Sequence, residues 1–226
     1  MIKPIILAGI IAVASLLPAV AEAQFSLSGR VTRENSDSAG RVVDESHVAF
    51  LASASVDYQT GRWRFGGNFT DGDSSTESFF FGSGSEYKRT WKELYAGYSV
   101  SPVVEVVGGV RDDRIEVVQY FFATESLFKV EQTLPFAGIR YHKHPRRVGV
   151  EVSALYYRGT ADVSEGLVDT SGDATGIRIQ VALPIRVGQS RSVITPGYDH
   201  ENFDVGSGAN QRGDRLFVQY SYTFRP

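Results

Sequence analysis

The sequence predicts an all-β protein: a closed, antiparallel, up-and-down transmembrane β-barrel of about ten strands, preceded by a cleaved signal peptide. Three observations carry this prediction. They are an N-terminal export signal, a hydrophobic period of two residues after it, and connections that alternate between short and long. The chain of 226 residues has 23 Gly, 14 Phe and 11 Tyr but a single Met, which favours strands over helices.

Composition excludes several classes of protein. A mean hydropathy of -0.15 excludes a bundle of transmembrane helices, which needs runs of about 20 apolar residues. The chain has no Cys, so it cannot be a disulfide scaffold, hold a Cys-ligated metal or use a thiol nucleophile. The net charge of -3 provides no general basic field, and we expect no nucleic-acid partner.

The first 23 residues resemble a secretory signal. Lys3 supplies a positive charge, residues 5–17 are uncharged and mostly apolar, and Ala21 and Ala23 provide small side chains for a peptidase. We expect cleavage after Ala23, so that residues 1–23 are the signal and residues 24–226 form the barrel. The alternative is an uncleaved amphipathic or buried N-terminal helix, but the run is apolar all round and the rest of the chain offers no helical partner for it.

After the signal, apolar and polar residues alternate as in half-buried strands. The first five predicted strands are 25–33, 48–58, 62–69, 91–100 and 104–111. The third has Trp63, Phe65 and Phe69 on one face. The fifth has Val104, Val106 and Val110 opposite Glu105 and Arg111.

The other five predicted strands are 134–142, 148–157, 177–183, 191–201 and 215–224. In the eighth, Ile177, Ile179 and Val181 oppose Arg178 and Gln180. The seventh and tenth alternate in the same way, whereas in the ninth the apolar face is ambiguous.

The connections separate into two kinds that alternate along the chain. Tight turns lie at 59–61, 101–102, 143–146 and 186–190, and long polar loops at 35–46, 71–89, 112–133, 159–174 and 202–213. All turns and both termini therefore lie at one end of the barrel, and all long loops at the other. This is typical of outer-membrane barrels. A soluble, lipocalin-like barrel is the alternative, with the apolar faces pointing inward.

The charges of the polar faces would then line the lumen, where residues of both signs can pair. These candidate lumen residues are Arg30, Arg62, Arg64, Glu93, Glu105, Arg111, Arg140, Glu151, Arg178 and Arg215. Aromatic residues add two candidate girdles, one near the turns (Tyr58, Trp63, Tyr98, Tyr141 and Phe224) and one near the loops (Tyr87, Trp91, Tyr120 and Tyr157).

The last strand carries an apolar row of five alternating residues: Leu216, Val218, Tyr220, Tyr222 and Phe224. With this row and the pattern of connections, the chain resembles the small outer-membrane β-barrel proteins of Gram-negative bacteria, over residues 24–224. The resemblance implies an outer-membrane location and recognition of the row by the barrel-insertion machinery. Arg225 and Pro226 depart from the family pattern, in which the Phe is usually terminal.

Barrel size and loop composition give the functional expectations. About eight strands leave room only for side chains and open porins need 16 to 18, so ten strands favour a plugged lumen over a narrow, anion-favouring pore. We expect a structural or surface-interaction role, with outer-membrane lipid, lipopolysaccharide and an extracellular ligand as partners. The loop aromatics are candidate contacts, unless they fold inward or prolong strands: Phe79, Phe80, Phe81, Phe121, Phe122 and Phe128.

The resemblance raises a catalytic alternative, because the omptin proteases are ten-stranded barrels with an Asp pair and an Asp/His pair at the rim. Asp71 and Asp73 match the first pair by position, but the loop 159–174 contains no His, and Asp199-His200 has the wrong spacing. An Asp-Gly-Asp turn explains the first pair more simply. We expect no enzyme, no cofactor and no metal site.

Overall fold

The computed structural model describes residues 23–39, 44–78, 83–121, 124–143, 147–165, 168–188, 191–205 and 209–224, and these residues are β-strands and their connections. The strands are β1 (Gln24–Ala39), β2 (Asp44–Thr60), β3 (Trp63–Ser78), β4 (Ser83–Ser99), β5 (Val104–Phe121), β6 (Thr124–Lys143), β7 (Val150–Glu165), β8 (Val168–Ala182), β9 (Ile185–Arg186), β10 (Ser192–Val205) and β11 (Ala209–Phe224). Within the described residues, no helix could span a membrane.

Every long strand pairs antiparallel with its neighbour, and β11 pairs with both β10 and β1, which closes the sheet. Ten strands thus form one barrel, as the sequence predicts. The two-residue β9 follows Leu183 and Pro184 at the end of β8 and pairs with β10, while Ile185 bridges to Val148. Closure leaves none of the ten barrel strands as an unpaired edge.

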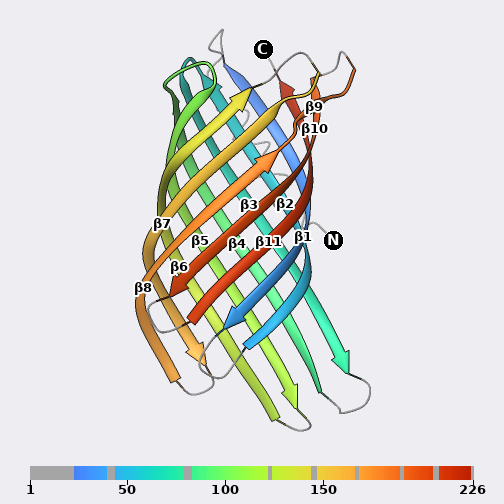
Figure 1. Ribbon diagram of the computed structural model, residues 1–226, viewed down its shortest axis with the longest axis vertical. Coiled ribbons are helices and arrows are strands. Elements are labelled where there is room, and N and C mark those ends of the chain that lie inside the picture. Colours follow the sequence, from blue (N-terminus) through green and yellow to red (C-terminus); the bar gives the residue numbers. More distant parts are fainter. Residues whose placement is uncertain are drawn as a thin grey trace.

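The two ends of the barrel differ (Figure 1). At the end we call the turn end, β1 begins, β11 ends and β2 turns directly into β3 at Gly61, whose φ of 55° suits glycine. At the opposite hairpin end, consecutive strands project well beyond the middle of the barrel, as the lower part of Figure 1 shows.

The strands are longer than predicted, because most of each expected long loop is strand. The ten barrel strands have 14 to 20 residues. Strand pairing at the hairpin end continues to Ala39 and Asp44, Ser78 and Ser83, Phe121 and Thr124, Glu165 and Val168, and Val205 and Ala209. The expectation of long external loops is therefore wrong for most of these residues: the polar segments form paired hairpins.

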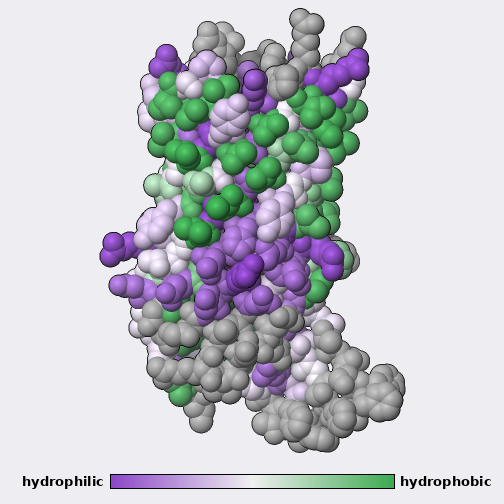
Figure 2. Space-filling model, viewed as in Figure 1, coloured by the Kyte–Doolittle hydropathy of each residue, from purple (hydrophilic) through white to green (hydrophobic). Residues whose placement is uncertain are grey.

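The outer surface has two zones (Figure 2). The half nearer the turn end carries an apolar band, which includes Val31, Ala52, Phe65, Leu94, Val106, Ile139, Tyr156, Ile177, Ile179, Val181, Ile194, Leu216, Val218, Tyr220 and Phe224. Toward the hairpin end lies a polar collar, which includes Arg33, Asn35, Asp37, Asp71, Asp73, Lys88, Thr90, Lys92, Asp112, Arg114, Glu116, Glu131, Thr133, Arg158, Thr160, Asp162, Asp169, Asp173, Asn202, Asp204, Asn210, Arg212 and Asp214. Such a band is the surface that a lipid bilayer can cover.

Aromatic side chains border the band at the turn end. The ring of Trp63 lies 5.0 Å from that of Tyr98, and the rings of Tyr222 and Phe224 are 4.8 Å apart. This agrees with the girdle predicted there. The second girdle is wrong for Tyr87, Trp91 and Tyr157, because these side chains are buried inside the barrel.

The interior reverses the polarity of the surface. In the hairpin half, most inward side chains form an apolar core, in which the polar Ser36 and His47 are also buried. The core includes Ala49, Leu51, Tyr87, Ile115, Val117, Phe128, Val130, Ala161, Val163, Ala174, Phe203 and Val205, each 5% exposed or less. In the turn half, most inward side chains are polar or charged. The barrel therefore resembles a soluble protein at one end and a membrane barrel at the other.

Candidate functional site

A belt of ion pairs crosses the interior between the apolar core and the polar half. It consists of Glu34, Arg89, Arg111, Asp113, Glu201 and Arg215, from five different strands, and each is 2% exposed or less. We call these six residues the central belt. Three guanidinium groups and three carboxylates balance, so the belt has no net formal charge.

Arg89 and Arg111 hold the belt on the side of β4 and β5. Arg89 donates to Glu34 over 2.5 Å (Nη1 to Oε1), to Asp113 over 2.7 Å (Nη2 to Oδ2), and to Glu201. Arg111 donates to Asp113 over 2.7 Å and to Glu201 over 3.0 Å. Each carboxylate thus receives hydrogen bonds from at least two cations, which buried charges need.

Arg215 completes the belt from β11. Its Nη2 lies 2.9 Å from Glu34 Oε1 and its Nη1 lies 2.8 Å from Glu201 Oε2. The indole of Trp91 lies among the three guanidinium groups, whose central carbons are 5.0 Å (Arg89), 4.8 Å (Arg111) and 5.0 Å (Arg215) from the ring. Cation–π attraction therefore adds to the ion pairs.

A second cluster adjoins the belt on its polar side, around Asp199. Arg178 donates to this carboxylate over 2.6 Å and Arg30 over 3.3 Å, and Arg215 of the belt lies 3.7 Å away. Arg178 also reaches Glu93 at 3.4 Å. The two clusters thus form one continuous network across the barrel.

Closer to the turn end, the interior holds a cavity of about 120 Å³. Arg64 donates to Asp57 over 2.9 Å, and Arg140 donates to Glu105 over 3.4 Å. The hydroxyl of Tyr95 also donates to Asp57. We call this cavity the vestibule, because its residues Arg64 and Arg140 are partly exposed, unlike the arginines of the belt.

The structure places nine of the ten predicted lumen residues inside the barrel. Glu93, Glu105, Arg111, Arg178 and Arg215 are buried, and Arg30, Arg64, Arg140 and Glu151 line the vestibule. The prediction is wrong for Arg62, which lies exposed in the turn between β2 and β3, where the backbone leaves the strand.

Sequence reasoning missed about half of the network: Glu34, Asp57, Arg89, Asp113, Asp199 and Glu201. Arg89 and Asp113 lie in segments expected to be loops. They nevertheless continue the inward parity of β4 and β5, and that continuation was the signal that could have found them.

The predicted aromatic contacts fare differently. Phe79, Phe80, Phe81 and Phe122 lie outside the described residues, and Phe121 is the last residue of β5. The prediction of an external contact is wrong for Phe128, because this side chain faces the apolar core and is only 2% exposed. It prolongs a strand above the band, which was the alternative explanation.

The predicted assembly row does lie together on the outer face of β11. The side chains of the row are 37% to 59% exposed. Along the strand, the row consists of Leu216, Val218, Tyr220, Tyr222 and Phe224.

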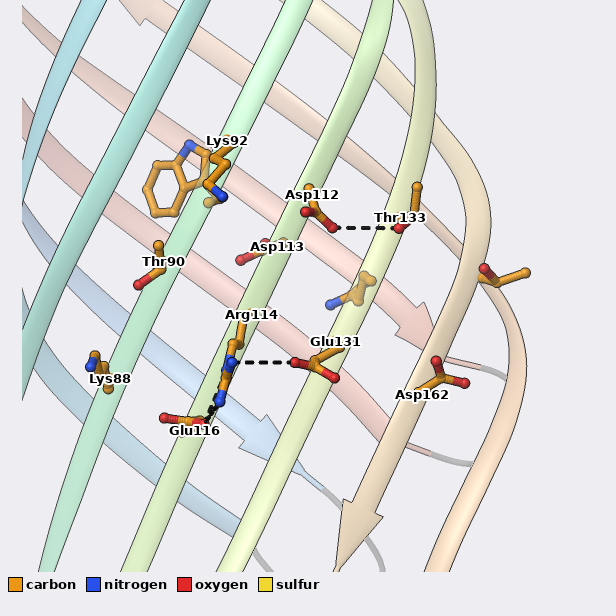
Figure 3. Close-up of a pocket in the computed structure, with 13 residues that line it drawn as sticks. Lys88, Thr90, Lys92, Asp112, Asp113, Arg114, Glu116, Glu131, Thr133 and Asp162 are labelled. Carbon is orange, nitrogen blue, oxygen red and sulfur yellow. Dashed lines mark hydrogen bonds and ion pairs between the residues drawn. The ribbon is translucent and has the colours of Figure 1, made fainter. Parts of the chain in front are cut away.

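The collar contains a hollow of about 600 Å³ across the outer faces of β4 to β7 (Figure 3). Arg114 at its centre contacts Glu116 and Glu131, the latter at 3.5 Å, and Thr133 donates to Asp112 over 3.4 Å. Lys88 and Lys92 line the same hollow from β4. The hollow therefore offers a polar surface with charges of both signs, next to the apolar band on its hairpin side.

The residues that match the omptin catalytic pairs do not converge. Asp71 and Asp73 face outward on β3, and Asp71 accepts a hydrogen bond from Thr90 over 2.7 Å. Asp199 points inward to Arg178, whereas His200 points outward and lies 2.8 Å from Asp214. Among the described residues, no group of three or more His, Cys, Asp or Glu side chains could hold a metal ion.

Comparison with known proteins relates this geometry to a class. No family model and no curated protein matches the sequence. Among solved structures, the outer membrane protease OmpT from Escherichia coli aligns with a TM-score of 0.57 at 8% identity, covering 89% of this chain and 96% of that one. The chain folds as an outer-membrane β-barrel.

Two further solved structures align with the barrel. The translocator domain of the autotransporter NalP from Neisseria meningitidis has a TM-score of 0.48 at 9% identity, covering 96% of this chain and 95% of that one. Neisserial surface protein A has a TM-score of 0.42 at 13% identity, covering 88% and 97%. The ten-stranded architecture is similar to that of OmpT, and at these identities the likeness concerns the fold alone.

Proposed function

We propose that this outer-membrane barrel is a non-conducting protein with a structural and surface-interaction role. The observation that carries the proposal is the double closure of its interior. An apolar core fills the hairpin half, and the central belt adjoins this core on the side of the turn end. A hydrated ion would have to pass through both layers.

The closure is energetically strong because its two layers resist an ion in different ways. In the core, Leu51, Ile115 and Phe203 are each 1% exposed or less, and a bare ion among such side chains loses its hydration without compensation. In the belt, the charges already bind one another. Removing the belt alone would therefore leave the core in place.

A narrow anion-favouring pore is the alternative function. Such a pore needs uncompensated positive charge along its path, because selectivity comes from charged side chains that line it. Here three arginines of the belt face three carboxylates. This balance supports a structural plug.

Planar-bilayer recording tests the proposal. We expect no discrete conductance steps from folded protein, and none after Arg111→Glu, with Arg114→Glu on the outer face as the matched control. Discrete steps whose size or anion preference changes with Arg111→Glu, but not with Arg114→Glu, would overturn the proposal in favour of the pore.

The surface role follows from the hairpin half. Between the segments that cross the apolar band, the chain runs much farther at the hairpin end than at the turn end, as paired hairpins. In outer-membrane barrels the longer connections between membrane-crossing segments face outward, so the hairpin end and its collar would stand outside the cell. The partners we propose are lipid at the apolar band, lipopolysaccharide at the collar and its hollow, and an extracellular ligand at the hairpin tips. Loss of lipopolysaccharide co-purification after Lys88→Glu and Lys92→Glu would support the second of these.

Export and assembly complete the proposal. Cleavage after Ala23 would give a mature protein that starts at Gln24, which intact mass measurement can test. The insertion machinery would read the outward row of β11. Folded protein should migrate differently from boiled protein in gel electrophoresis, and a detergent-free soluble monomer would contradict the assignment.

We propose no enzymatic role. A rim hydrolase using Asp71 and Asp73 remains the third alternative, and its simplest test is cleavage of basic peptides by folded protein. Cleavage that is lost with Asp71→Ala plus Asp73→Ala, at unchanged folding, would establish that alternative.

A further inference from the structure

The vestibule is a cavity inside the barrel, and its chemistry is not explained by the closure of the lumen. It occupies about 120 Å³ in the polar half of the lumen. Arg30 and Arg178 line it on the side of the belt and bind Asp199, which is fully buried. These contacts close the vestibule toward the hairpin end, so it can be entered only from the turn end.

The carboxylates around the vestibule already have partners. Asp57 accepts hydrogen bonds from Arg64 and Tyr95. Glu105 lies 3.4 Å from Arg140 and 3.9 Å from Arg64, and Glu93 lies 3.4 Å from Arg178. Few acceptors are therefore left for a cation.

The arginines, in contrast, keep donors. A guanidinium group has five N–H donors. Within the part of the chain that the structure describes, Arg64 and Arg140 each donate one hydrogen bond from the side chain, and Arg30 donates two. The side chains of Arg64 and Arg140 are 32% and 19% exposed, so the remaining donors are accessible.

The hydrogen-bonding groups and the size of the vestibule restrict its ligand. Four arginines and the carboxylates Asp57, Glu93 and Glu151 line it, and Glu105 and Asp199 bind these arginines from beside the lining. A lining with spare donors and few free acceptors fits a ligand that only accepts hydrogen bonds, and arginine pairs especially well with oxyanions. The volume equals about four water molecules at roughly 30 Å³ each, far below the pockets that hold drug-sized ligands.

We propose that the vestibule is a dead-end site, entered from the periplasm, that binds one oxyanion of phosphate or sulfate size. The oxyanion is a free ion or the terminal group of a larger periplasmic molecule whose remainder stays outside. Entry from the periplasm rests on the proposed orientation of the barrel, whereas anion binding by these arginines does not depend on a non-conducting lumen.

Thermal unfolding of detergent-folded protein tests the proposal, with inorganic phosphate, sulfate and glycerol phosphate as probes and chloride at equal ionic strength as reference. We expect a saturable rise in the unfolding temperature with phosphate or sulfate. A response to inorganic phosphate alone identifies the free ion, and a response to both phosphate probes identifies a terminal phosphate group. No rise beyond that of chloride overturns the proposal.

Two variants locate the binding. Arg140→Gln should weaken phosphate binding at least tenfold, whereas Arg62→Gln, in the exposed turn, should leave it unchanged. Ser153→Asp keeps every arginine and adds a carboxylate to the lining, and it should abolish binding in a barrel that still shows heat-modifiable migration. Unchanged binding in both Arg140→Gln and Ser153→Asp would place the anion elsewhere and overturn the proposal.

Discussion

Arg111 on β5 and Glu201 on β10 lie on strands that do not pair, and their side chains meet inside the barrel with 3.0 Å between Nη1 and Oε2. The contact joins opposite parts of the wall through the lumen. Because both side chains are fully buried, neither charge has water as an alternative partner. The belt to which they belong therefore fixes the cross-section of the barrel.

Removing one cation from the belt should be costly. Arg89→Met leaves Glu34, Asp113 and Glu201 with fewer partners in a buried place, and we expect a loss of about 3–5 kcal/mol in the free energy of unfolding. Arg114→Met on the outer face is the matched control and should cost less than about 1 kcal/mol, since Arg114 is 52% exposed. Urea unfolding in detergent micelles measures both. Equal effects would refute a structural role of the belt.

The apolar core of the hairpin half should behave like that of a soluble protein. Leu51 is 1% exposed, and its neighbour Phe50 is 65% exposed on the outer face of β2. Leu51→Ala should destabilise by about 2–5 kcal/mol through the cavity that it creates. Phe50→Ala should cost much less. A larger loss of stability in Phe50→Ala than in Leu51→Ala would contradict a stabilising role of the apolar core.

The two tryptophans report on the two faces of the wall. Trp63 is 48% exposed at the apolar band, whereas Trp91 is 3% exposed inside the barrel. In bilayers with brominated acyl chains, the fluorescence of a Trp91→Phe variant, which retains Trp63, should be quenched. The fluorescence of Trp63→Phe, which retains Trp91, should resist both brominated lipid and aqueous iodide. Strong iodide quenching of Trp91 would indicate a hydrated, open lumen.

A carboxylate of the collar should affect stability at acid pH. Hydrogen bonds from Tyr198 and then His200 hold the pKa of Asp214 below its ordinary value, on the polar collar beyond the apolar band. A lowered folded-state pKa means that ionised Asp214 stabilises the fold above its unfolded-state pKa of about 3.9. That contribution disappears as the pH falls through the folded-state value.

Asp214→Asn should therefore flatten the acid limb of the stability curve below about pH 4. Asp204→Asn removes the same charge from the collar and serves as the control. Urea unfolding as a function of pH measures the difference. Identical acid limbs for Asp214→Asn and the native protein would show that these hydrogen bonds do not form in solution.

Charge substitution maps the height of the lipid contact on one strand. Val218→Arg lies in the apolar band of β11 and should cost about 2–4 kcal/mol if it is near the bilayer midplane. Asn210→Arg lies in the collar of the same strand and should cost about 0–1 kcal/mol. Comparable losses at both positions would contradict the division into band and collar.

The sequence predicted the half of the barrel where apolar residues face outward. There, Ile177, Ile179 and Val181 alternate with Arg178 and Gln180. Because one face of the strand meets lipid and the other a polar lumen, this alternation predicts the strand and its orientation. The sequence did not predict the hairpin half, where the alternation is inverted. Ile115 and Val117 face inward and alternate with Arg114 and Glu116, which face water.

The candidate site was incomplete for the same reason. Arg111 was found because it lies beside the outward Val110, whereas Asp113 was missed because its neighbours Asp112 and Arg114 are polar. At the boundary between the two zones both faces of a strand carry charge, so alternation disappears although the strand continues. Which arginine meets which carboxylate depends on barrel closure, and no local pattern contains that information.

The long hairpins change what an approaching molecule would encounter on this protein. The collar is built from paired strands, so its side chains form a lattice, repeating every second residue at about 7 Å along a strand and about 4.8 Å between strands. An antibody raised against the folded collar would contact residues from several strands at once and would fail on linear peptides. Amino-acid substitutions that change this surface would be confined to alternate positions, because the residues between them face the interior of the barrel.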